Sequence, residues 1–210
     1  MKSLKEANLQ HNAITSVAPL AGVTALEKLE ISYNNLASIA PLADAKSLLW
    51  LNASNNVIND LGSLGKATTL TYLSLENNKI SNISTIAGCL NLTELNIAEN
   101  NVSDISKLSA LTKMMYFNFS NNKVKELPGF TKDCALVVIT GNHNNIKSLD
   151  ALSGLKNLNT VNMDYNSELS SLKPLTNCDK LVEVNVYGTK VREASALIKA
   201  SVIVNFTPVS

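Results

Sequence analysis

Residues capable of acid–base, metal-binding or nucleophilic chemistry occur in this sequence, but none of them forms a recognisable catalytic set. The two histidines, His11 and His143, lie too far apart to share a metal ion. The carboxylates include Glu76, Glu94 and Asp164, but no nucleophile and base accompany them at catalytic spacing. No glycine-rich phosphate loop and no HExxH or GxSxG motif occurs. We therefore predict a protein that is not an enzyme, with no cofactor and no metal site.

The three cysteines, Cys89, Cys134 and Cys178, are too few and too widely spaced for a disulfide framework. None belongs to a CxxC pair or lies next to a histidine at metal-ligand spacing. We interpret them as small buried thiols, which say little about the redox compartment.

Composition excludes several classes of partner. The 210 residues are 45% hydrophobic and 17% charged, and 18 basic and 17 acidic side chains give a net charge of +1. No basic block suited to nucleic-acid phosphates occurs, and no apolar run approaches the roughly 18 residues of a membrane span. The start, MKSLKEANLQHN, is too polar for a secretory signal, so an export signal would lie outside this sequence.

A repeat of 22 residues organises the whole chain and must position any site. The copies begin at Leu4, Leu26, Leu48, Leu70, Leu92, Met114, Leu136, Leu158 and Leu181. We predict one repeat domain over residues 4–202, followed by a truncated tenth copy over 203–210 that starts at Ile203. Self-similarity at this period indicates a solenoid.

Each copy has the same apolar pattern, which predicts one strand and one return segment. In repeat five the fourth and sixth residues, Leu95 and Ile97, point inward from a short strand, so their neighbours point outward. The apolar residues that follow recur every third position, which suits an extended or 3₁₀-like return path. One coil cannot enclose its own core, and stacked neighbours must complete it.

The ninth position of the repeat is an asparagine in eight successive copies and a threonine, Thr189, in the next. These residues are Asn12, Asn34, Asn56, Asn78, Asn100, Asn122, Asn144 and Asn166. An asparagine amide offers one acceptor and two donors to backbone groups that a turn leaves unpaired. We predict a structural asparagine ladder that bonds neighbouring coils, and no ligand-binding role for it.

The pattern LxxLxLxxNxIxxIxxLxxL over residues 4–202 resembles the leucine-rich repeat, and its 22-residue form is similar to the internalin-type repeats of bacterial surface proteins. Prolines at one return-path position, Pro19, Pro41 and Pro174, carry the internalin likeness. The resemblance implies an α/β-type solenoid: a curved right-handed coil with a parallel sheet on its concave face, 3₁₀ or extended segments on its convex face, and a protein-binding role. Repeats of this length also occur in intracellular phosphatase regulators.

Residues at the third, fifth and seventh positions should face the concave surface. The only tryptophan and two of the five tyrosines share the third position, and such side chains dominate binding at interfaces. Alternatively, the aromatic side chains shield the sheet and pack on one another. The fifth position is rich in asparagine, which suits hydrogen bonding to a protein or a glycan, or keeps the exposed sheet soluble. The predicted ligand-binding residues are Trp50, Tyr72, Tyr116, Tyr33, Glu94, Asn96, Asn118, Tyr165 and Tyr187.

Three places depart from the repeat. Repeat eight has one extra residue after Asn166, which is either a small bulge or a local binding loop. Gly141 holds a core position between those of Phe119 and Met163, which indicates large–small–large packing. Leu4 begins a repeat without a capping helix, and Pro208 should end the strand pairing. We expect either neighbouring domains of a longer chain or a partner that covers the first coil.

The leading hypothesis is a non-catalytic protein–protein recognition module, an internalin-like domain on the surface of a bacterium or secreted from it. It would bind a protein, glycoprotein or glycan on its concave face, without nucleic acid and without membrane insertion. One alternative is an intracellular regulatory scaffold, which would be cytoplasmic. The other is a structural spacer within a larger protein.

Overall fold

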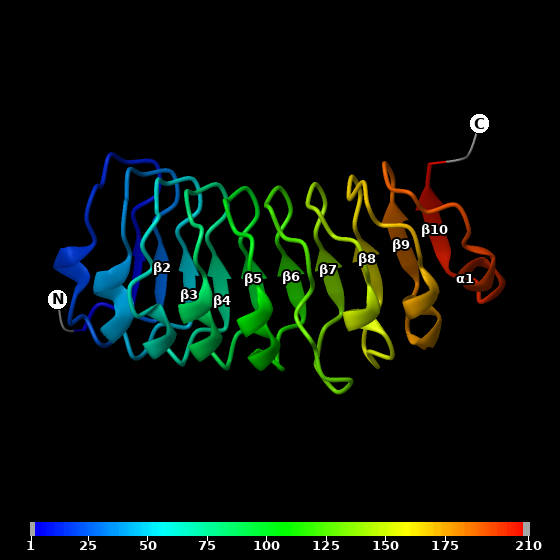
Figure 1. The fold of residues 1–210 in the computed structure, drawn as a ribbon. Coiled ribbons are helices and arrows are strands. Elements are labelled where there is room, and N and C mark those ends of the chain that lie inside the picture. The colour runs from blue at the N-terminus through cyan, green and yellow to red at the C-terminus, as the bar shows by residue number, and fades with distance from the viewer. Residues whose placement is uncertain (1–2, 208–210) are drawn as a thin grey trace.

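The structure, a computed structural model, describes residues 3–207 and is a single solenoid of stacked coils (Figure 1). Within these residues ten strands form one parallel sheet whose strand order follows the chain from β1 to β10. This architecture confirms the leucine-rich repeat fold predicted from the 22-residue period. The strands are β1 (Glu6–Asn8), β2 (Lys28–Glu30), β3 (Trp50–Asn52), β4 (Tyr72–Ser74), β5 (Glu94–Asn96), β6 (Tyr116–Asn118), β7 (Val138–Thr140), β8 (Thr160–Asn162), β9 (Glu183–Val186) and β10 (Ile203–Phe206).

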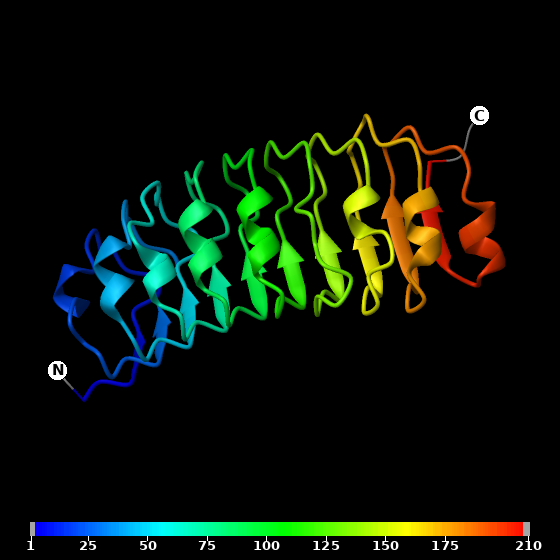
Figure 2. The ribbon, with the colours of Figure 1, turned by 60° about the horizontal axis from the view of Figure 1, so that its bottom comes forward.

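Short 3₁₀ turns line the face opposite the sheet, as the threefold apolar spacing predicted (Figure 2). Pro19, Pro41 and Pro174 each lie in the first turn of one of them, where a missing N–H costs no hydrogen bond. The sixth coil returns without such a turn, and the coil before β10 has an α-helix instead. The elements are η1 (Ala18–Leu20), η2 (Ala40–Asp44), η3 (Leu64–Lys66), η4 (Ser84–Gly88), η5 (Ser106–Ala110), η6 (Asp150–Leu152), η7 (Lys173–Asn177) and α1 (Ser195–Lys199).

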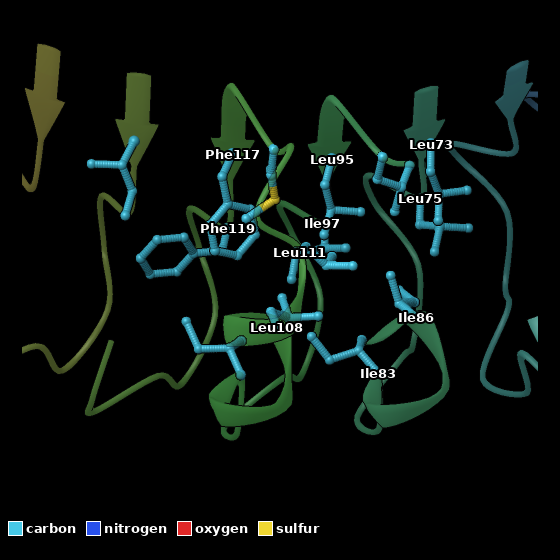
Figure 3. Close-up of a cluster of buried hydrophobic side chains, with 14 of the residues drawn as sticks. Leu73, Leu75, Ile83, Ile86, Leu95, Ile97, Leu108, Leu111, Phe117 and Phe119 are labelled. Carbon is cyan, nitrogen blue, oxygen red and sulfur yellow. The ribbon is translucent and has the colours of Figure 1, made fainter. Parts of the chain in front are cut away.

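The core is a continuous apolar layer between the sheet and the return segments. Leu95 lies in β5 and Ile97 directly follows it. Both side chains point toward Leu108 and Leu111 of the return path, and all four residues are buried (Figure 3). Each coil repeats this arrangement, so the core extends from coil to coil along the whole sheet. A strand of three residues is stable here because its neighbours on both sides complete the burial.

The asparagine at the ninth position bonds both its own coil and the preceding one. The amide group of Asn100 donates to the carbonyls of Ile97 and Ala98 in its own coil, at 3.1 and 3.0 Å, and to that of Leu75 in the preceding coil, at 2.9 Å. Its Oδ1 accepts the Ile80 N–H at 3.0 Å. The same four bonds recur at Asn34, Asn56, Asn78, Asn122, Asn144 and Asn166.

The two ends of this column differ from its middle. Asn12 is exposed and donates only within its own coil, to the carbonyls of Leu9 and Gln10. The Thr189 hydroxyl donates to the Val186 carbonyl at 2.8 Å and accepts the Val191 N–H at 3.3 Å. Threonine thus keeps the bond to the carbonyl three residues before it, but its single donor leaves none for the coil before it.

The residue before each ladder asparagine adopts a left-handed backbone, which the sequence analysis did not predict. The non-glycine examples are His11, Tyr33, Asn55, Asn77, Glu99, Asn121, His143 and Tyr165, with φ between 51° and 56°. In repeat nine Gly188 takes this position with φ 66°. A left-handed backbone costs most residues other than glycine about 1 kcal/mol. The hydrogen bonds of the ladder asparagines offset this cost and hold each turn in place.

Gly141 is a core position whose missing side chain is replaced by a neighbour. A Cβ built on Gly141 would lie 2.2 Å from Cζ of Phe119, so the ring fills the space above this glycine. Phe119 is fully buried and also contacts the ring of Phe117, with centroids 4.9 Å apart. This is the large–small–large packing that the sequence indicated.

We therefore expect Gly141→Leu to lower the free energy of unfolding by about 1–3 kcal/mol, because it overpacks a filled site. Combining it with Phe119→Leu should recover part of that loss, since the shorter side chain vacates the space. Urea titration of the two single variants and the double variant measures both effects. Strictly additive losses would contradict the contact between the two positions.

The extra residue of repeat eight forms a compact turn. The Leu169 N–H donates to the Asn166 carbonyl at 3.0 Å, and Leu169 is fully buried. Glu168, at the turn, pairs with Lys190 at 2.8 Å. The core therefore continues through this repeat, which favours the bulge interpretation over a binding loop.

The predicted register of the last copy was wrong by two residues. Ile203 pairs with Glu183, the third residue of repeat nine, so the tenth copy begins at Ser201 and not at Ile203. Val204 and Phe206 therefore pack against the core, while Ile203 is 57% exposed on the sheet surface. The helical segment α1 shortens the preceding return path, which removes the residues that a count of 22 requires. Pro208, predicted to end the strand pairing, lies outside the described residues.

Candidate ligand-binding surface

The concave face, formed by side chains at the third, fifth and seventh positions, carries the group of aromatic residues predicted from the sequence. Parallel pairing without a shift aligns the third-position residues Lys28, Trp50, Tyr72, Glu94 and Tyr116 on adjacent strands β2 to β6. Trp50 and Tyr72 are partly buried, and Tyr116 is 45% exposed. None of the three belongs to the core.

Part of this column is packed into a stack. The rings of Trp50 and Tyr72 lie 4.8 Å apart with an angle of 9° between their planes. The ammonium nitrogen of Lys28 lies 5.0 Å from the centroid of the Trp50 ring, a cation–π contact. Mutual packing, one of the two interpretations of these aromatics, therefore describes Trp50 and Tyr72. Tyr116 stands apart, two strands from Tyr72, with Glu94 on the strand between them.

A cavity of about 210 Å³ lies along β4 to β7, where it is lined by both tyrosines and extends past Tyr116 to Val138 and Thr140. Its polar lining comes from Tyr72, Glu94, Asn96, Tyr116, Asn118 and Thr140. Burial raises the pKa of the Tyr72 hydroxyl above its usual value, and the negative charge of Glu94 adds to this shift. Within residues 3–207 no lysine or arginine forms an ion pair with Glu94.

The asparagines of the fifth position are more engaged than the sequence suggested. Oδ1 of Asn96 accepts the Ala98 N–H at 3.0 Å, and its amide donates to Glu76 at 2.9 Å. Asn118 likewise accepts the N–H and the hydroxyl of Ser120. Much of the hydrogen-bonding capacity of these asparagines is therefore used to order the ends of the strands, and less of it is free for a ligand.

The concave face is acidic, although the whole chain is nearly neutral. Its third, fifth and seventh positions contain a single lysine, Lys28, over repeats one to nine. Six carboxylates share these positions: Glu6, Glu30, Glu76, Glu94, Asp164 and Glu183. The lysines lie mostly on the return segments and strand flanks. The net charge of the whole chain does not reveal this separation of acidic from basic side chains, which appears when the positions are grouped by the face on which they lie.

The remaining predicted residues form separate groups near the two ends of the sheet. Tyr33 stacks on His11 and Tyr165 stacks on His143, with ring centroids 4.3 Å apart in both pairs. These residues have left-handed backbone at the turn after each strand. Tyr187 is 46% exposed near Tyr165, and its N–H donates to Asp164. The structure thus gathers Trp50, Tyr72, Glu94, Asn96, Tyr116 and Asn118, and places Tyr33, Tyr165 and Tyr187 outside that cluster.

Groups suited to metal or nucleophilic chemistry do not converge in the described part of the chain. No group of three or more histidine, cysteine, aspartate or glutamate side chains there could hold a metal ion. Cys89, Cys134 and Cys178 are free and buried, in three different coils. Burial raises the pKa of the Cys89 thiol to about 11, so this thiol stays protonated at neutral pH.

This shift predicts alkaline sensitivity. Cys89 ionises near pH 9 when unfolded and near pH 11 when folded, so the folded state holds the proton more tightly between those values. The free energy of unfolding should fall as pH rises from 9 to 11, by roughly 2–3 kcal/mol from this residue. Urea titration of wild type and Cys89→Ala from pH 8 to 11 measures it. Parallel pH profiles for the two proteins would contradict the assignment to Cys89.

The repeated strand, the asparagine ladder and the 3₁₀ return define this chain as a leucine-rich repeat protein. The family model described as leucine-rich repeats (2 copies) matches residues 2–44. Within residues 3–207 no helix is long and apolar enough to cross a membrane.

Solved structures with the same fold include bacterial and plant proteins. Internalin F (inlF) of Listeria monocytogenes is 25% identical with a TM-score of 0.89, and the match covers 100% of this chain and 63% of that one. A leucine-rich repeat protein of Leptospira interrogans is 23% identical with a TM-score of 0.88, covering 100% and 57%. The plant peptide hormone receptor RGFR1, in complex with RGF2, is 20% identical with a TM-score of 0.77, covering 98% and 40%.

The chain thus structurally resembles Listeria internalins and spans less than two thirds of the length of these proteins. A comparison with curated proteins by sequence found no match.

Proposed function

We propose that this chain is a non-catalytic recognition module that binds a protein ligand on its concave face. The observation that carries the proposal is the central aromatic cluster: Trp50, Tyr72 and Tyr116 lie on an ordered sheet outside the core, and the two tyrosines line an open cavity. Aromatic side chains held on a rigid surface lose little conformational entropy on binding, so they contribute strongly to affinity.

The sheet is a preorganised platform for such a ligand. Every strand is bonded to its neighbours, and the asparagine ladder fixes the turns that follow β2 to β8. Parallel strands lie about 4.8 Å apart, so residues at one repeat position form a straight row of contacts. A receptor of this fold solved in complex with RGF2 provides a precedent for ligand binding by such a solenoid.

Similarity to known structures also supports a proposal for the setting of the module. The likeness to internalin F supports a bacterial protein that is secreted or held at the cell surface. Because the chain spans only part of the length of its relatives, we propose that the solenoid, from the first copy at Leu4 through β10, is the repeat domain of a longer protein with neighbouring domains. An export signal and a cell-wall anchor in the full-length gene would support this location, and their absence would favour a cytoplasmic scaffold.

Capture of the ligand tests the function directly. The purified domain is immobilised, exposed to extracellular and host-cell protein fractions, and compared with a domain in which Trp50 is replaced by alanine. A protein retained by the wild type and lost by the variant supports recognition through the concave face. Equal retention by both, or retention of nothing beside a folded domain, would contradict it and favour a structural spacer.

A further inference from the structure

We propose that the cavity between Tyr72 and Tyr116 is a subsite for an arginine side chain, and that the ligand therefore presents a basic segment to the concave face. This inference rests on the proposed function, because it names the chemistry of the ligand at the same surface.

The chain already contains one aromatic site filled by a cation. Lys28 lies over Trp50, Trp50 stacks on Tyr72, and each residue comes from the next strand along the sheet. Glu94 interrupts this row, and Tyr116 resumes it one strand later. Among the described residues, Tyr72 and Tyr116 therefore have no cation between them, and a cavity lies where one would bind.

The dimensions of this opening suit a flat group. Tyr72 and Tyr116 stand two strands apart, which places their backbones roughly 10 Å from each other. A planar group that packs at about 3.5–4 Å from each neighbouring ring spans most of that distance. Glu94, on the strand between them, lines the cavity and faces the bound group.

Charge complementarity selects a cation. The Glu94 carboxylate has no ion-pair partner within residues 3–207, whereas the three ion pairs found there, such as Lys5–Glu27 at 2.9 Å, lie outside the concave positions. The carboxylates of Glu30 and Glu76 belong to the same face, whose third, fifth and seventh positions contain a single lysine, Lys28, over repeats one to nine. A neutral glycan gains nothing from this charge, and an acidic ligand is repelled by it.

The chemistry of the cavity favours arginine over lysine. A guanidinium group is planar, stacks on aromatic faces, and offers a fork of donors that binds both oxygens of a carboxylate. It is also more weakly hydrated than an ammonium group, so it is transferred from water into a half-enclosed cavity at lower cost. Asn96 and Asn118 also line the cavity, but their Oδ1 atoms already accept hydrogen bonds from Ala98 and Ser120, so Glu94 supplies the acceptor for the guanidinium.

The test uses short peptides that differ at one side chain. Acetyl-Gly-Gly-Arg-Gly-Gly-amide is titrated into the ¹⁵N-labelled domain beside the lysine and citrulline versions, and amide shifts are followed. We expect saturable shifts confined to residues of β4 to β7, weaker binding by lysine, and none by citrulline, which is nearly isosteric but uncharged. Glu94→Gln should weaken binding about tenfold, the loss typical of a hydrogen bond to a charged group.

Glu6 provides a matched control. It occupies the same repeat position as Glu94 on β1, without aromatic neighbours in its row, so Glu6→Gln removes the same charge and should leave the affinity unchanged. Equal losses from Glu6→Gln and Glu94→Gln, equal binding of citrulline and arginine, or no saturable shift would each overturn the subsite.

The two proposals can fail separately. If the arginine peptide does not bind but capture of the protein ligand still depends on Trp50, the subsite is wrong and the function stands. If the peptide binds at β4 to β7 but capture is insensitive to Trp50, the subsite stands and the proposed function is wrong.

Discussion

Replacing Trp50 and Tyr72 together by alanine is expected to weaken binding of the captured ligand at least about 100-fold, because aromatic hot spots each contribute roughly 2 kcal/mol or more. The two rings stack on each other and lie outside the core. Removing both should therefore lower the free energy of unfolding only by the value of the stack and its partial burial, roughly 1–2 kcal/mol. Surface plasmon resonance and a urea titration measure the two effects.

An exposed apolar residue on the return path provides the control for this prediction. Leu90 is 53% exposed in the turn between η4 and β5, outside the concave positions. Leu90→Ala removes apolar surface without touching the concave face, and its affinity should equal that of the wild type. An unchanged affinity in the double variant, or an equal loss in Leu90→Ala, would place the binding surface elsewhere.

Asn100→Ala is expected to lower the free energy of unfolding by about 3 kcal/mol, because it leaves the buried Ile80 N–H unpaired and removes three further hydrogen bonds. The Leu75 and Ile97 carbonyls keep a second donor, from Asn78 and Asn122. The cost is therefore smaller than four independent bonds would imply. Equilibrium unfolding in urea measures it.

Asn12 is the matched control within the same column. It has the same position in the repeat but bonds only carbonyls of its own coil and is exposed. Asn12→Ala should cost less than about 1 kcal/mol, since water replaces its partners. Similar losses for Asn12→Ala and Asn100→Ala would show that the bonds between coils contribute little to stability.

The sequence alone was sufficient for the architecture because each repeat encodes the same local choices. The apolar residues at positions such as Leu95 and Ile97 fix which face of the strand is buried, and one register error would reverse it. Repetition then places every coil against a copy of itself, so the stack follows without further information. The 22-residue period predicts the wrong start for the last copy, at Ile203, because a short helix, α1, replaces the usual return segment before it.

The column of aromatic residues was also predictable, because strands aligned without a shift turn a repeat position into a row. Which of those side chains stack on one another was not predictable from the sequence. Only the coordinates show that Trp50 and Tyr72 form a stack closed by Lys28, while Tyr116 stays apart across Glu94. Side-chain rotamers decide this, and they depend on neighbours that a linear pattern does not contain.

The sequence by itself therefore determined the fold, the buried face and the row of residues that meets solvent on the sheet, since these follow from periodicity. The tertiary structure decided which of those residues bond to each other and which remain free. Asn96 uses its amide on Glu76, Tyr33 stacks on His11, and the Glu94 carboxylate faces an open cavity. The physical reason is that periodicity acts through burial, which every coil shares, whereas a binding site depends on differences between adjacent coils.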